Sequence, residues 1–490
     1  MVHFPLFYFS NNLFDLSPTS FVELLAITFS FGFAIVGISI GITKIIKKPT
    51  NPIFIIVNIF LFFSYGIFFE SLSKNVIEIN HFYIIPIFFA VFFIFLKYAP
   101  KFSIKLAKVV FTILFVFIII DVVTLFSEYE FNNNEKYWAQ SNDTNIFNLE
   151  GLPNIIFIIP DEYPSKSWLL EHVNYDNSMF LKKLEMMGFD IGDTHSNYMM
   201  SNHSISSTFN MNYVVHTDQN FEYTNEISQS TFLKLLRQNG YELIQINGAG
   251  NEYLENFDIN LCSPNKIWTH EEFYKQTIIF PILEKLVLDN KIDNRMCFFN
   301  ELLKIENLEN KKRFVYAHIL MPHSPYYTED ENGNLIDLKR DNDGLELLGN
   351  NIDIINDKLI NMMPEIIENN PNTIIIIMSD HGYRSDFNVT SKQMFENLFV
   401  VYLPEDYELE EIKSNVNIFR SIIRNVDKNM QLLKRNLELN KNNITTTLQV
   451  GLSDLVEKKY FLLSEHSNLG HILDDDNYKN KKKIKIQTIS

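Results

Sequence analysis

Carboxylates and imidazoles follow three apolar segments of the chain, and these residue types are suited to catalysis. Asp161 and Glu162 come directly after the run NIIFIIP, and Asp380 and His381 come one residue after the run TIIIIM. His323 stands one residue after the run RFVYAHILM. If these runs are parallel strands of one sheet, their carboxyl ends meet at the same rim, where sites of open α/β sheets form. We therefore expect these side chains to lie together.

The types of three of these residues suit a divalent cation. Asp161 and Asp380 offer hard carboxylate oxygens, and His381 offers an imidazole nitrogen. This mixture fits Zn²⁺ or Mn²⁺, and it fits Mg²⁺ or Ca²⁺ less well because of the nitrogen. One such residue alone would be explained as a turn or a helix cap, but the set as a whole favours one metal ion.

A candidate nucleophile lies in the segment 197–213, NYMMSNHSISSTFNMNY, which holds four serines and one threonine. A hydroxyl bound to a divalent cation loses its proton more easily and can then attack phosphorus or sulfur. Ser201 and Ser204 are the candidates. Serine-rich segments also serve as loops and helix caps, and composition does not choose between the two residues.

The elements that would position these residues alternate between strands and helices. Such alternation predicts an α/β fold with a mostly parallel sheet and helices on both faces. The apolar runs and helical spacings predict strands at 154–159, 241–246, 313–321, 373–378 and 398–403, and helices at 177–187, 231–239 and 352–367.

The first 127 residues have a different character, because they hold 25 of the 44 phenylalanines. Uncharged stretches of 20, 21 and 18 residues separate Glu23 from Lys44, Lys48 from Glu70, and Glu78 from Lys97. A helix needs about 20 apolar residues to cross a bilayer. We therefore expect a transmembrane anchor at 1–127, a linker at 128–152 and an outer catalytic domain at 153–490. The four expected spans are about 22–43, 52–70, 81–98 and 107–126.

The charges predict the orientation and the location of the chain. Lysines cluster between the first two spans and between the last two, which places both loops in the cytoplasm and both termini outside it. The expected location is thus a membrane that the chain crosses several times, with the catalytic domain outside the cytoplasm. The net charge of −17 argues against nucleic acid as a partner. Cys262 and Cys297 either form a disulfide or stay as thiols, and the oligomeric state is not indicated.

The motifs resemble the sulfatase-like branch of the alkaline phosphatase superfamily in its membrane-anchored bacterial form. That form includes lipoteichoic acid synthases and the phosphoethanolamine and phosphoglycerol transferases of the cell envelope. The resemblance covers about 153–404 and extends more weakly to Val426. Its most specific element is the strand followed by Ser379-Asp380-His381-Gly382. The stretch HILMPHSPY is similar to the H-x-x-x-x-H-x-P-x-Y of phosphoethanolamine transferases, with His318 and His323 as its histidines.

The resemblance also implies roles for single residues. Relatives carry T-x-x-S-x-x-S-x-x-N, and this pattern places the nucleophile at Ser201, with Ser204, Ser207 and Asn210 in register. It implies that one metal ion is bound by four ligands, and that His323, together with His318, contacts the transferred group. The implied ligands are Asp161, Ser201, Asp380 and His381.

Three positions need separate comment. Glu162 stands where many relatives have Gly or a second Asp, and it is a candidate ligand in place of Asp161 or beside it. His318 alternates with apolar and aromatic neighbours on its strand, so a buried structural position suits it as well as a functional one. Cys262-Ser263-Pro264-Asn265-Lys266 imitates the C-x-P-S-R motif of sulfatases, but Asn and Lys stand where Ser and Arg belong.

The expected function is transfer of a phospho-substituent, of phosphoethanolamine or phosphoglycerol type, onto an envelope glycan or lipid through a covalent Ser201 intermediate. The membrane spans favour a phospholipid donor. One alternative is a hydrolase of phosphate or sulfate esters that uses the same residues. A further alternative is an inactive domain that binds an envelope glycan, and the complete set of ligand positions argues against it.

Overall fold

The computed structural model describes part of the 490-residue chain. The described residues are 18–45, 112, 119, 149–196, 198, 201–211, 227–248, 254, 256–262, 271–275, 277, 279–305, 311–338, 344–383, 395–409, 412 and 414–426. Contacts between Cα atoms divide the chain into two units. The first comprises 1–136 and 265–290, and the second comprises 137–264 and 291–490.

The first unit contains helix α2 (Pro18–Ile45), helix α12 (Glu271–Lys275) and the beginning of helix α13 (Phe280–Leu303). Helix α2 covers the whole of the first expected span, 22–43. Among the helices in the described part of the chain, none combines the length and the apolar character needed to cross a bilayer. The expected spans 52–70, 81–98 and 107–126 lie outside the described residues, apart from Thr112 and Ile119.

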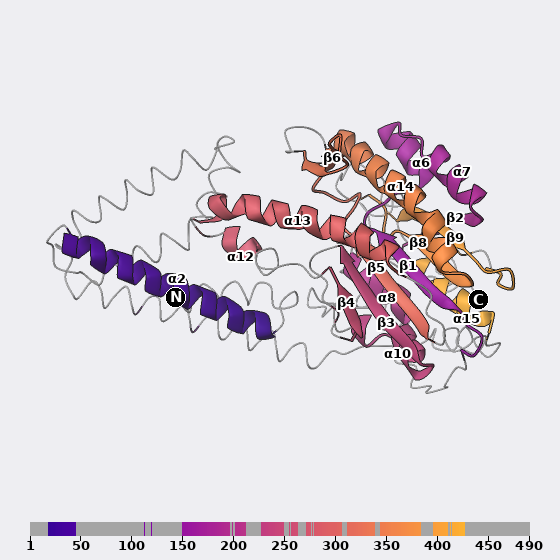
Figure 1. Ribbon diagram of the computed structural model, residues 1–490, viewed down its shortest axis with the longest axis horizontal. Helices are drawn as coiled ribbons and strands as arrows, with labels where there is room; N and C mark the ends of the chain where they lie inside the picture. Colours follow the sequence, from indigo (N-terminus) through magenta and orange to yellow (C-terminus); the bar gives the residue numbers. More distant parts are fainter. Residues whose placement is uncertain are drawn as a thin grey trace, which may run out of the picture. The chain divides into compact units, whose positions relative to one another are not determined.

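The second unit is built on a seven-stranded sheet (Figure 1). Five adjacent strands are parallel, and β9 runs antiparallel to both of its neighbours, which confirms a mostly parallel α/β sheet. The order across the sheet is β2 (Phe189–His195), β9 (Glu396–Tyr402), β8 (Thr373–Met378), β1 (Asn154–Pro160), β5 (Lys312–Ile319), β3 (Tyr241–Gly248) and β4 (Ile259–Leu261). A separate hairpin joins β6 (Tyr327–Glu329) to β7 (Leu335–Asp337).

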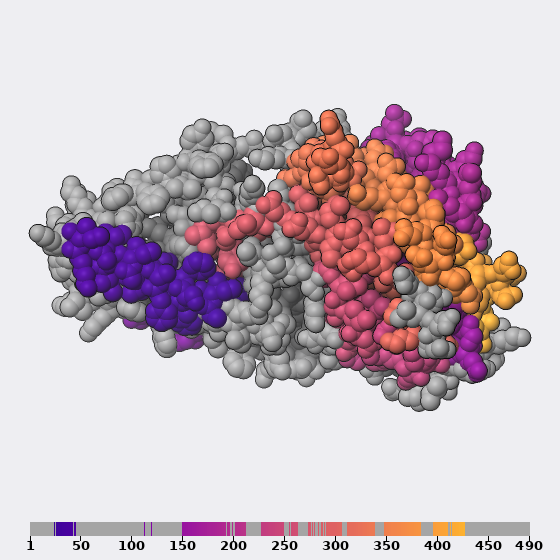
Figure 2. All heavy atoms as spheres, viewed as in Figure 1, coloured from indigo at the N-terminus to yellow at the C-terminus, as the bar shows by residue number. Residues whose placement is uncertain are grey.

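Helices cover both faces of this sheet, so the side chains of its central strands are buried on both sides. On β1, Ile155 and Phe157 belong to one buried cluster, and Ile156 and Ile158 belong to the other. The first cluster includes residues of α8 (Ser201–Asn210), α10 (Thr231–Gln238) and α15 (Ile418–Arg424). The second includes residues of α7 (Ser178–Met186), α13 and α14 (Gly344–Asn369). The result is the expected α/β/α sandwich, and Figure 2 shows α7 and α14 forming its outer surface on one side.

Burial explains why the apolar runs predicted strands. A parallel strand covered by helices on both faces has no polar side, so its sequence is continuously apolar. All six residues of β8 are buried, and six of the seven residues of β1 are buried. The sequence does not indicate strand direction, so the antiparallel course of β9 was not predicted. The strand β2, FDIGDTH, was missed because it is too polar to form such a run.

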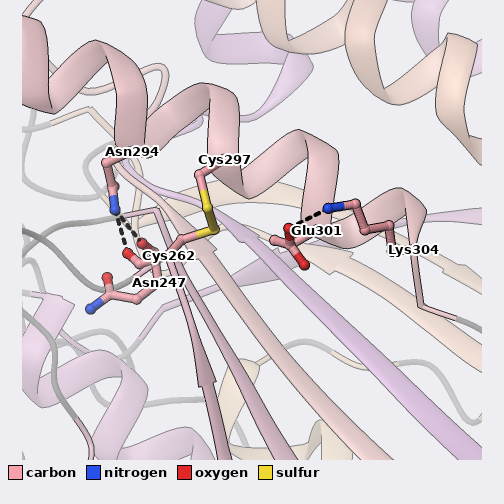
Figure 3. Close-up of a disulfide and its surroundings, with 6 residues drawn as sticks. All are labelled: Asn247, Cys262, Asn294, Cys297, Glu301 and Lys304. Carbon is pink, nitrogen blue, oxygen red and sulfur yellow. Dashed lines mark hydrogen bonds and ion pairs between the residues drawn. A yellow bond between two sulfur atoms is a disulfide. The ribbon is translucent and has the colours of Figure 1, made fainter.

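The two cysteines form a disulfide in the second unit (Figure 3). Cys262 follows β4 and Cys297 lies in α13, with their Cα atoms 5.7 Å apart. Asn294, one turn before Cys297, donates from Nδ2 to the carbonyl of Asn247 at 2.8 Å and to that of Cys262. Of the two alternatives left open by the sequence, the structure therefore contains the disulfide.

Short helical elements complete the second unit. They are α6 (Lys166–Trp168), the π-helical turn η2 (Leu169–Val173) and the 3-10 turn η3 (Asn415–Asn417). The side chain of Ser165 caps α6 by accepting a hydrogen bond from the backbone N–H of Trp168.

Candidate metal and catalytic site

The end of β1 places Asp161 between its two neighbouring strands. The backbone N–H of Asp161 donates to the carbonyl of Ile319 at 3.0 Å, which extends the pairing of β1 with β5 by one residue. Glu162 follows with a φ of 61°, in the left-handed region that favours glycine. Its backbone N–H donates to Oδ1 of Asp380 at 3.0 Å. The turn after β1 is thus bonded directly to the segment that follows β8.

The end of β8 carries Ser379, Asp380 and His381, all of them buried. Oδ1 of Asp380 also accepts from the N–H of His381 at 3.0 Å. Ser379 Oγ accepts from the N–H of Tyr163 at 2.8 Å and donates to the carbonyl of His381 at 2.8 Å. The ring of His381 bonds through Nδ1 to the carbonyl of Gly382 at 2.7 Å. Nδ1 is the donor in that bond, because a carbonyl oxygen can only accept, and Nε2 is the ring nitrogen that faces the site.

The end of β5 contributes the two other histidines. Nε2 of the buried His318 lies 3.3 Å from Oδ2 of Asp161, and Nδ1 lies 3.3 Å from the hydroxyl of Tyr316. His323 lies in the loop beyond the strand, and its N–H donates to the carbonyl of Asp161 at 3.2 Å. Its Nδ1 donates to the carbonyl of Ser324 at 2.6 Å, and its Nε2 lies 3.5 Å from Oε2 of Glu162. The loop contains cis peptide bonds before Pro322 and Pro325.

The first turn of α8 separates the two candidate nucleophiles. Ser201, the first residue of the helix, is half-buried, and its Oγ lies 3.3 Å from Nε2 of His381. Ser204 is fully buried, and its Oγ donates to the backbone carbonyl of Asp380 at 2.5 Å. Ser207 donates to the carbonyl of Ser204 within the helix at 2.8 Å. Ser201 is therefore the serine whose hydroxyl faces the site, while the other two hydroxyls are engaged with backbone carbonyls.

Opposing effects act on the carboxyl of Asp161. Burial by itself raises the pKa, because it removes the charged form from water. The hydrogen bond from His318 and the charges of His323, His318 and His381 outweigh this effect and hold the pKa of Asp161 far below its ordinary value. Asp161 is therefore a carboxylate, the form in which it can bind a cation.

Buried oxygens at the centre of the site suit a metal ion. Oδ1 of Asp161 and Oδ2 of Asp380 accept no hydrogen bond from any described residue, although both side chains are buried. Oδ2 of Asp380 also lies 3.4 Å from Nε2 of His381, so both a carboxylate oxygen and an imidazole nitrogen are available at this point. Such unsatisfied groups are costly to bury, and a cation between them removes that cost. The donor set therefore fits a divalent metal.

Ligand atoms of Asp161, His318 and Asp380 all lie within 4.8 Å of one another, so these three buried residues could hold a metal ion. The sequence left open a buried position and a functional role for His318, and the structure buries it beside the two expected ligands. The structure also brings Ser201 and His381 to this group. Glu162 and His323 form a neighbouring pair that is linked to the group through the backbone of Asp161.

Supporting residues were missed by the sequence analysis. Asn415 donates from Nδ2 to the carbonyl of Ser379 at 3.1 Å, and Asn397 donates to the same carbonyl at 2.6 Å. Asn351 of α14 binds the loop that carries His323. For Asn351 a signal existed, because it is a polar residue on the helix face that carries the buried Leu348 and Ile352.

The cysteine that imitates a sulfatase nucleophile has no free thiol. Cys262 is bonded to Cys297, so it offers no sulfur atom for attack on an ester. His466 and His471, near the end of the chain, lie outside the described residues.

Comparison with solved structures gives similarities of low identity. The C-terminal periplasmic domain of EcEptC from Escherichia coli, in complex with Zn, is 15% identical, with a TM-score of 0.36 over 55% of this chain and 80% of that chain. The integral membrane lipooligosaccharide phosphoethanolamine transferase A from Neisseria meningitidis is 10% identical, with a TM-score of 0.37 over 73% of each chain. A 2-O GAG sulfatase is 12% identical, with a TM-score of 0.35 over 54% of this chain and 68% of that one.

Comparison with models of protein families identifies the family of this chain. None of the curated proteins matches the chain. The model of the family described as Sulfatase matches residues 153–425, which is more than half of the chain and contains every site residue described above. The chain therefore belongs to the sulfatase family.

Proposed function

We propose that this protein is a membrane-anchored, metal-dependent transferase that moves a phospho-substituent, of phosphoethanolamine or phosphoglycerol type, through a covalent intermediate on Ser201. The acceptor is an envelope glycan or lipid. The observation that carries the proposal is the position of Ser201, whose hydroxyl is half-buried and faces His381 at 3.3 Å beside two buried carboxylates.

Asp161, Asp380, His381 and Ser201 would hold one divalent ion, with Glu162 beside Asp161, and the short distance from His318 to Asp161 makes His318 a further candidate ligand. Mixed oxygen and nitrogen donors favour Zn²⁺ or Mn²⁺ over Mg²⁺ or Ca²⁺. When bound, the ion would make the Ser201 hydroxyl more acidic and would offset negative charge on the phosphoryl oxygens.

The chain's own groups favour two in-line displacements. In the first, Ser201 Oγ forms a bond to phosphorus, the bond from phosphorus to the donor's alcohol oxygen breaks, and the serine proton leaves with that alcohol. In the second, an acceptor hydroxyl bonds to the phosphorus, the bond to Ser201 breaks, and the acceptor's proton returns to Ser201. The intermediate is a phosphodiester in which Ser201 carries the whole phospho-substituent at the first position of α8, where backbone N–H groups and the helix dipole stabilise negative charge.

His323 would contact the transferred group. Its backbone is bonded to Asp161, its Nε2 faces Glu162, and its side chain remains 21% exposed, so a substrate can reach it. Transfer of a phosphoryl group depends mainly on positioning and charge neutralisation, which is what such a histidine provides.

The proposed location is the bacterial inner membrane, with the catalytic domain outside the cytoplasm. The two lysine-rich loops support this orientation under the positive-inside rule. The disulfide between Cys262 and Cys297 supports it independently, because disulfides persist in oxidising compartments and are rare in the cytosol. Spans that hold the domain near lipid head groups favour a phospholipid donor.

The test uses the full-length chain in detergent, with its metal content measured. Wild type, Ser201→Ala and the matched control Ser207→Ala are incubated with labelled phosphatidylethanolamine and labelled phosphatidylglycerol, and with an aryl phosphate and an aryl sulfate. We expect one of the lipids to be consumed, a Ser201 that carries phosphoethanolamine or phosphoglycerol to be found by mass spectrometry, and only Ser201→Ala to lose both signals.

Three results would change the proposal. Full turnover by Ser201→Ala would show that another group is the nucleophile. Cleavage of the aryl esters with neither lipid consumed would replace the transferase with a hydrolase of phosphate or sulfate esters. A protein without metal and without turnover would support the inactive glycan-binding domain.

A further inference from the structure

The loop that carries His323 is held by one buried side chain of α14. Nδ2 of Asn351 donates to the carbonyls of Pro322 at 3.0 Å, His323 at 3.3 Å and Pro325 at 3.1 Å. Oδ1 of the same residue accepts from the N–H of Tyr327 at 2.7 Å. Asn351 is completely buried. A single amide therefore satisfies both ends and the middle of the segment 322–327.

His323 lies beyond the strand pairing of the sheet, so the loop backbone contributes to its position. The pairing of β5 with β1 and β3 ends at Ile319, before the loop begins. Beyond that point the N–H of His323 donates to the Asp161 carbonyl, and its ring donates to the Ser324 carbonyl. The ring is bonded through Nδ1 to the Ser324 carbonyl, so a movement of that carbonyl also moves Nε2.

A second buried group supports the start of the loop. The Nη2 group of Arg295, on α13, donates to the carbonyl of Leu320 at 3.2 Å. Its guanidinium lies 5.1 Å from the centre of the Tyr327 ring, within the range of a cation–π contact. Arg295 therefore contacts Leu320 and Tyr327, and Asn351 binds the backbone from Pro322 to Tyr327.

The sequence position of Asn351 is consistent with a role beyond packing. It lies on the face of α14 that carries the buried Leu348, Ile352 and Ile355, where an apolar residue would pack against its neighbours. A buried amide at such a place is stable only when its hydrogen bonds are made, and the Asn351 amide bonds to the backbone of the loop at four residues.

We propose that Asn351 is a positioning residue that sets the place of His323 in the reaction. The inference rests on the proposed function, since it assumes that His323 contacts the transferred group. Without the Asn351 amide, the carbonyls of Pro322, His323 and Pro325 lose a buried donor, and the loop moves to regain hydrogen bonds. The His323 ring then leaves its place opposite Glu162, while the carboxylates of β1 and β8 stay where they are.

The experiment compares Asn351→Ala with a matched control, Asn370→Ala. Asn370 is a buried asparagine directly after α14, and its Nδ2 donates to the carbonyls of Ile305 and Ile366, away from the loop. Both variants thus remove a buried amide that binds backbone carbonyls. His323→Ala and the double variant His323→Ala/Asn351→Ala complete the set.

All variants are made in the full-length chain and receive two measurements. The first is kcat and KM on labelled phosphatidylethanolamine, labelled phosphatidylglycerol and an aryl phosphate. The second is hydrogen–deuterium exchange of the peptide that contains Tyr327, whose N–H donates to Asn351, and this measurement needs no activity.

We expect Asn351→Ala to lower kcat by about 10- to 100-fold, with a much smaller change in KM, because a small misplacement of a catalytic group has effects of this size. Exchange at Tyr327 should accelerate. Asn370→Ala should keep turnover and exchange close to wild type even if its melting temperature falls. The double variant should be no slower than His323→Ala, because the effects of two substitutions that act through the same group do not add.

Two outcomes would overturn the inference. Equal kcat for Asn351→Ala and Asn370→Ala, with His323→Ala impaired, would show that the loop keeps its place without the amide. If the loss of kcat in the double variant equals the product of the losses in the two single variants, Asn351 acts on something other than His323. Full turnover by Ser201→Ala and His323→Ala would instead refute the proposed function, and with it the catalytic role of Asn351. The exchange measurement would still decide whether Asn351 holds the loop.

Discussion

The ends of β8 and β5 both bring a histidine to the site, but they hold it in different ways. His381 follows β8 almost directly, is completely buried, and belongs to a segment bonded to β1, α8 and Asn415. His323 lies in a loop beyond β5, has a side chain that is 21% exposed, and relies on the amide of Asn351. A residue next to a strand takes its position from the sheet, whereas a residue in a loop needs a separate support.

We propose that this difference divides the site into two parts. The rigid part consists of Asp161, Asp380, His318 and His381, which are buried, lie on or next to strands and would hold the metal. The adjustable part consists of His323 and Ser201, which are half-buried, lie on a loop and at a helix start and would contact the transferred group, with Ser201 also a proposed metal ligand. Variants in the two parts should therefore change different observables.

The largest effect is expected from Asp380→Asn, in the rigid part. The change removes a charged oxygen that faces His381, so metal content should fall together with turnover. Loss of a metal that stabilises the transition state by several kcal/mol corresponds to at least about a thousandfold in kcat. Elemental analysis and lipid turnover measure the two quantities.

Asp258→Asn is the control for that variant, because the carboxylate of Asp258 binds the N–H of Leu243 and the side chain of Arg237. A full complement of metal in Asp380→Asn would contradict the assignment of the rigid part.

The next effect is expected from His323→Ala, in the adjustable part. Turnover should fall by about 10²- to 10³-fold, in the range of catalytic groups that assist transfer, while metal content and melting temperature stay at wild-type values. The half-buried ring of His323 bonds to the Ser324 carbonyl and faces Glu162 rather than the carboxylates of Asp161 and Asp380, which is why metal content and melting temperature should not change. Loss of metal in this variant would show that the two parts are not separate.

A smaller effect is expected from Ser204→Ala, which removes a donor to the Asp380 carbonyl. The unfolding free energy should fall by about 1 kcal/mol, and turnover by about tenfold, the range found for residues that orient ligands. Chemical denaturation and kinetics are compared with Ser207→Ala, whose hydroxyl bonds inside α8. A turnover loss as large as that of Ser201→Ala would mean that Ser204 takes part in the reaction itself.

The smallest effect on turnover is expected from the double variant Cys262→Ser/Cys297→Ser. The disulfide closes a loop with a sequence separation of 35, so its loss should lower stability by about 2–4 kcal/mol. The strand ends that hold the metal ligands belong to β1, β5 and β8, which carry neither cysteine. Turnover at temperatures well below unfolding should therefore remain, and its loss there would indicate that α13 supports the site through this bond.

The same division explains what could be predicted from the sequence. The mostly parallel sheet and the grouping of Asp161 with Asp380 followed from buried apolar runs, because such runs place their following residues at one rim. The direction of β9 and the contact between Asn351 and the His323 loop could not be derived this way. Both depend on packing between segments that are far apart in the chain, and a local sequence pattern contains no information about such packing.

Glu162 combines a left-handed backbone with a buried carboxylate that faces His323. A residue other than glycine in that conformation lowers the folding stability by about 1–2 kcal/mol. Glu162 therefore makes the protein less stable, but it supplies a carboxylate beside His323. A library selected only for heat resistance should recover Gly or Asn at 162, whereas a library selected for turnover should reject them. Attempts to thermostabilise this protein would therefore do well to keep position 162 fixed and to search elsewhere in the chain.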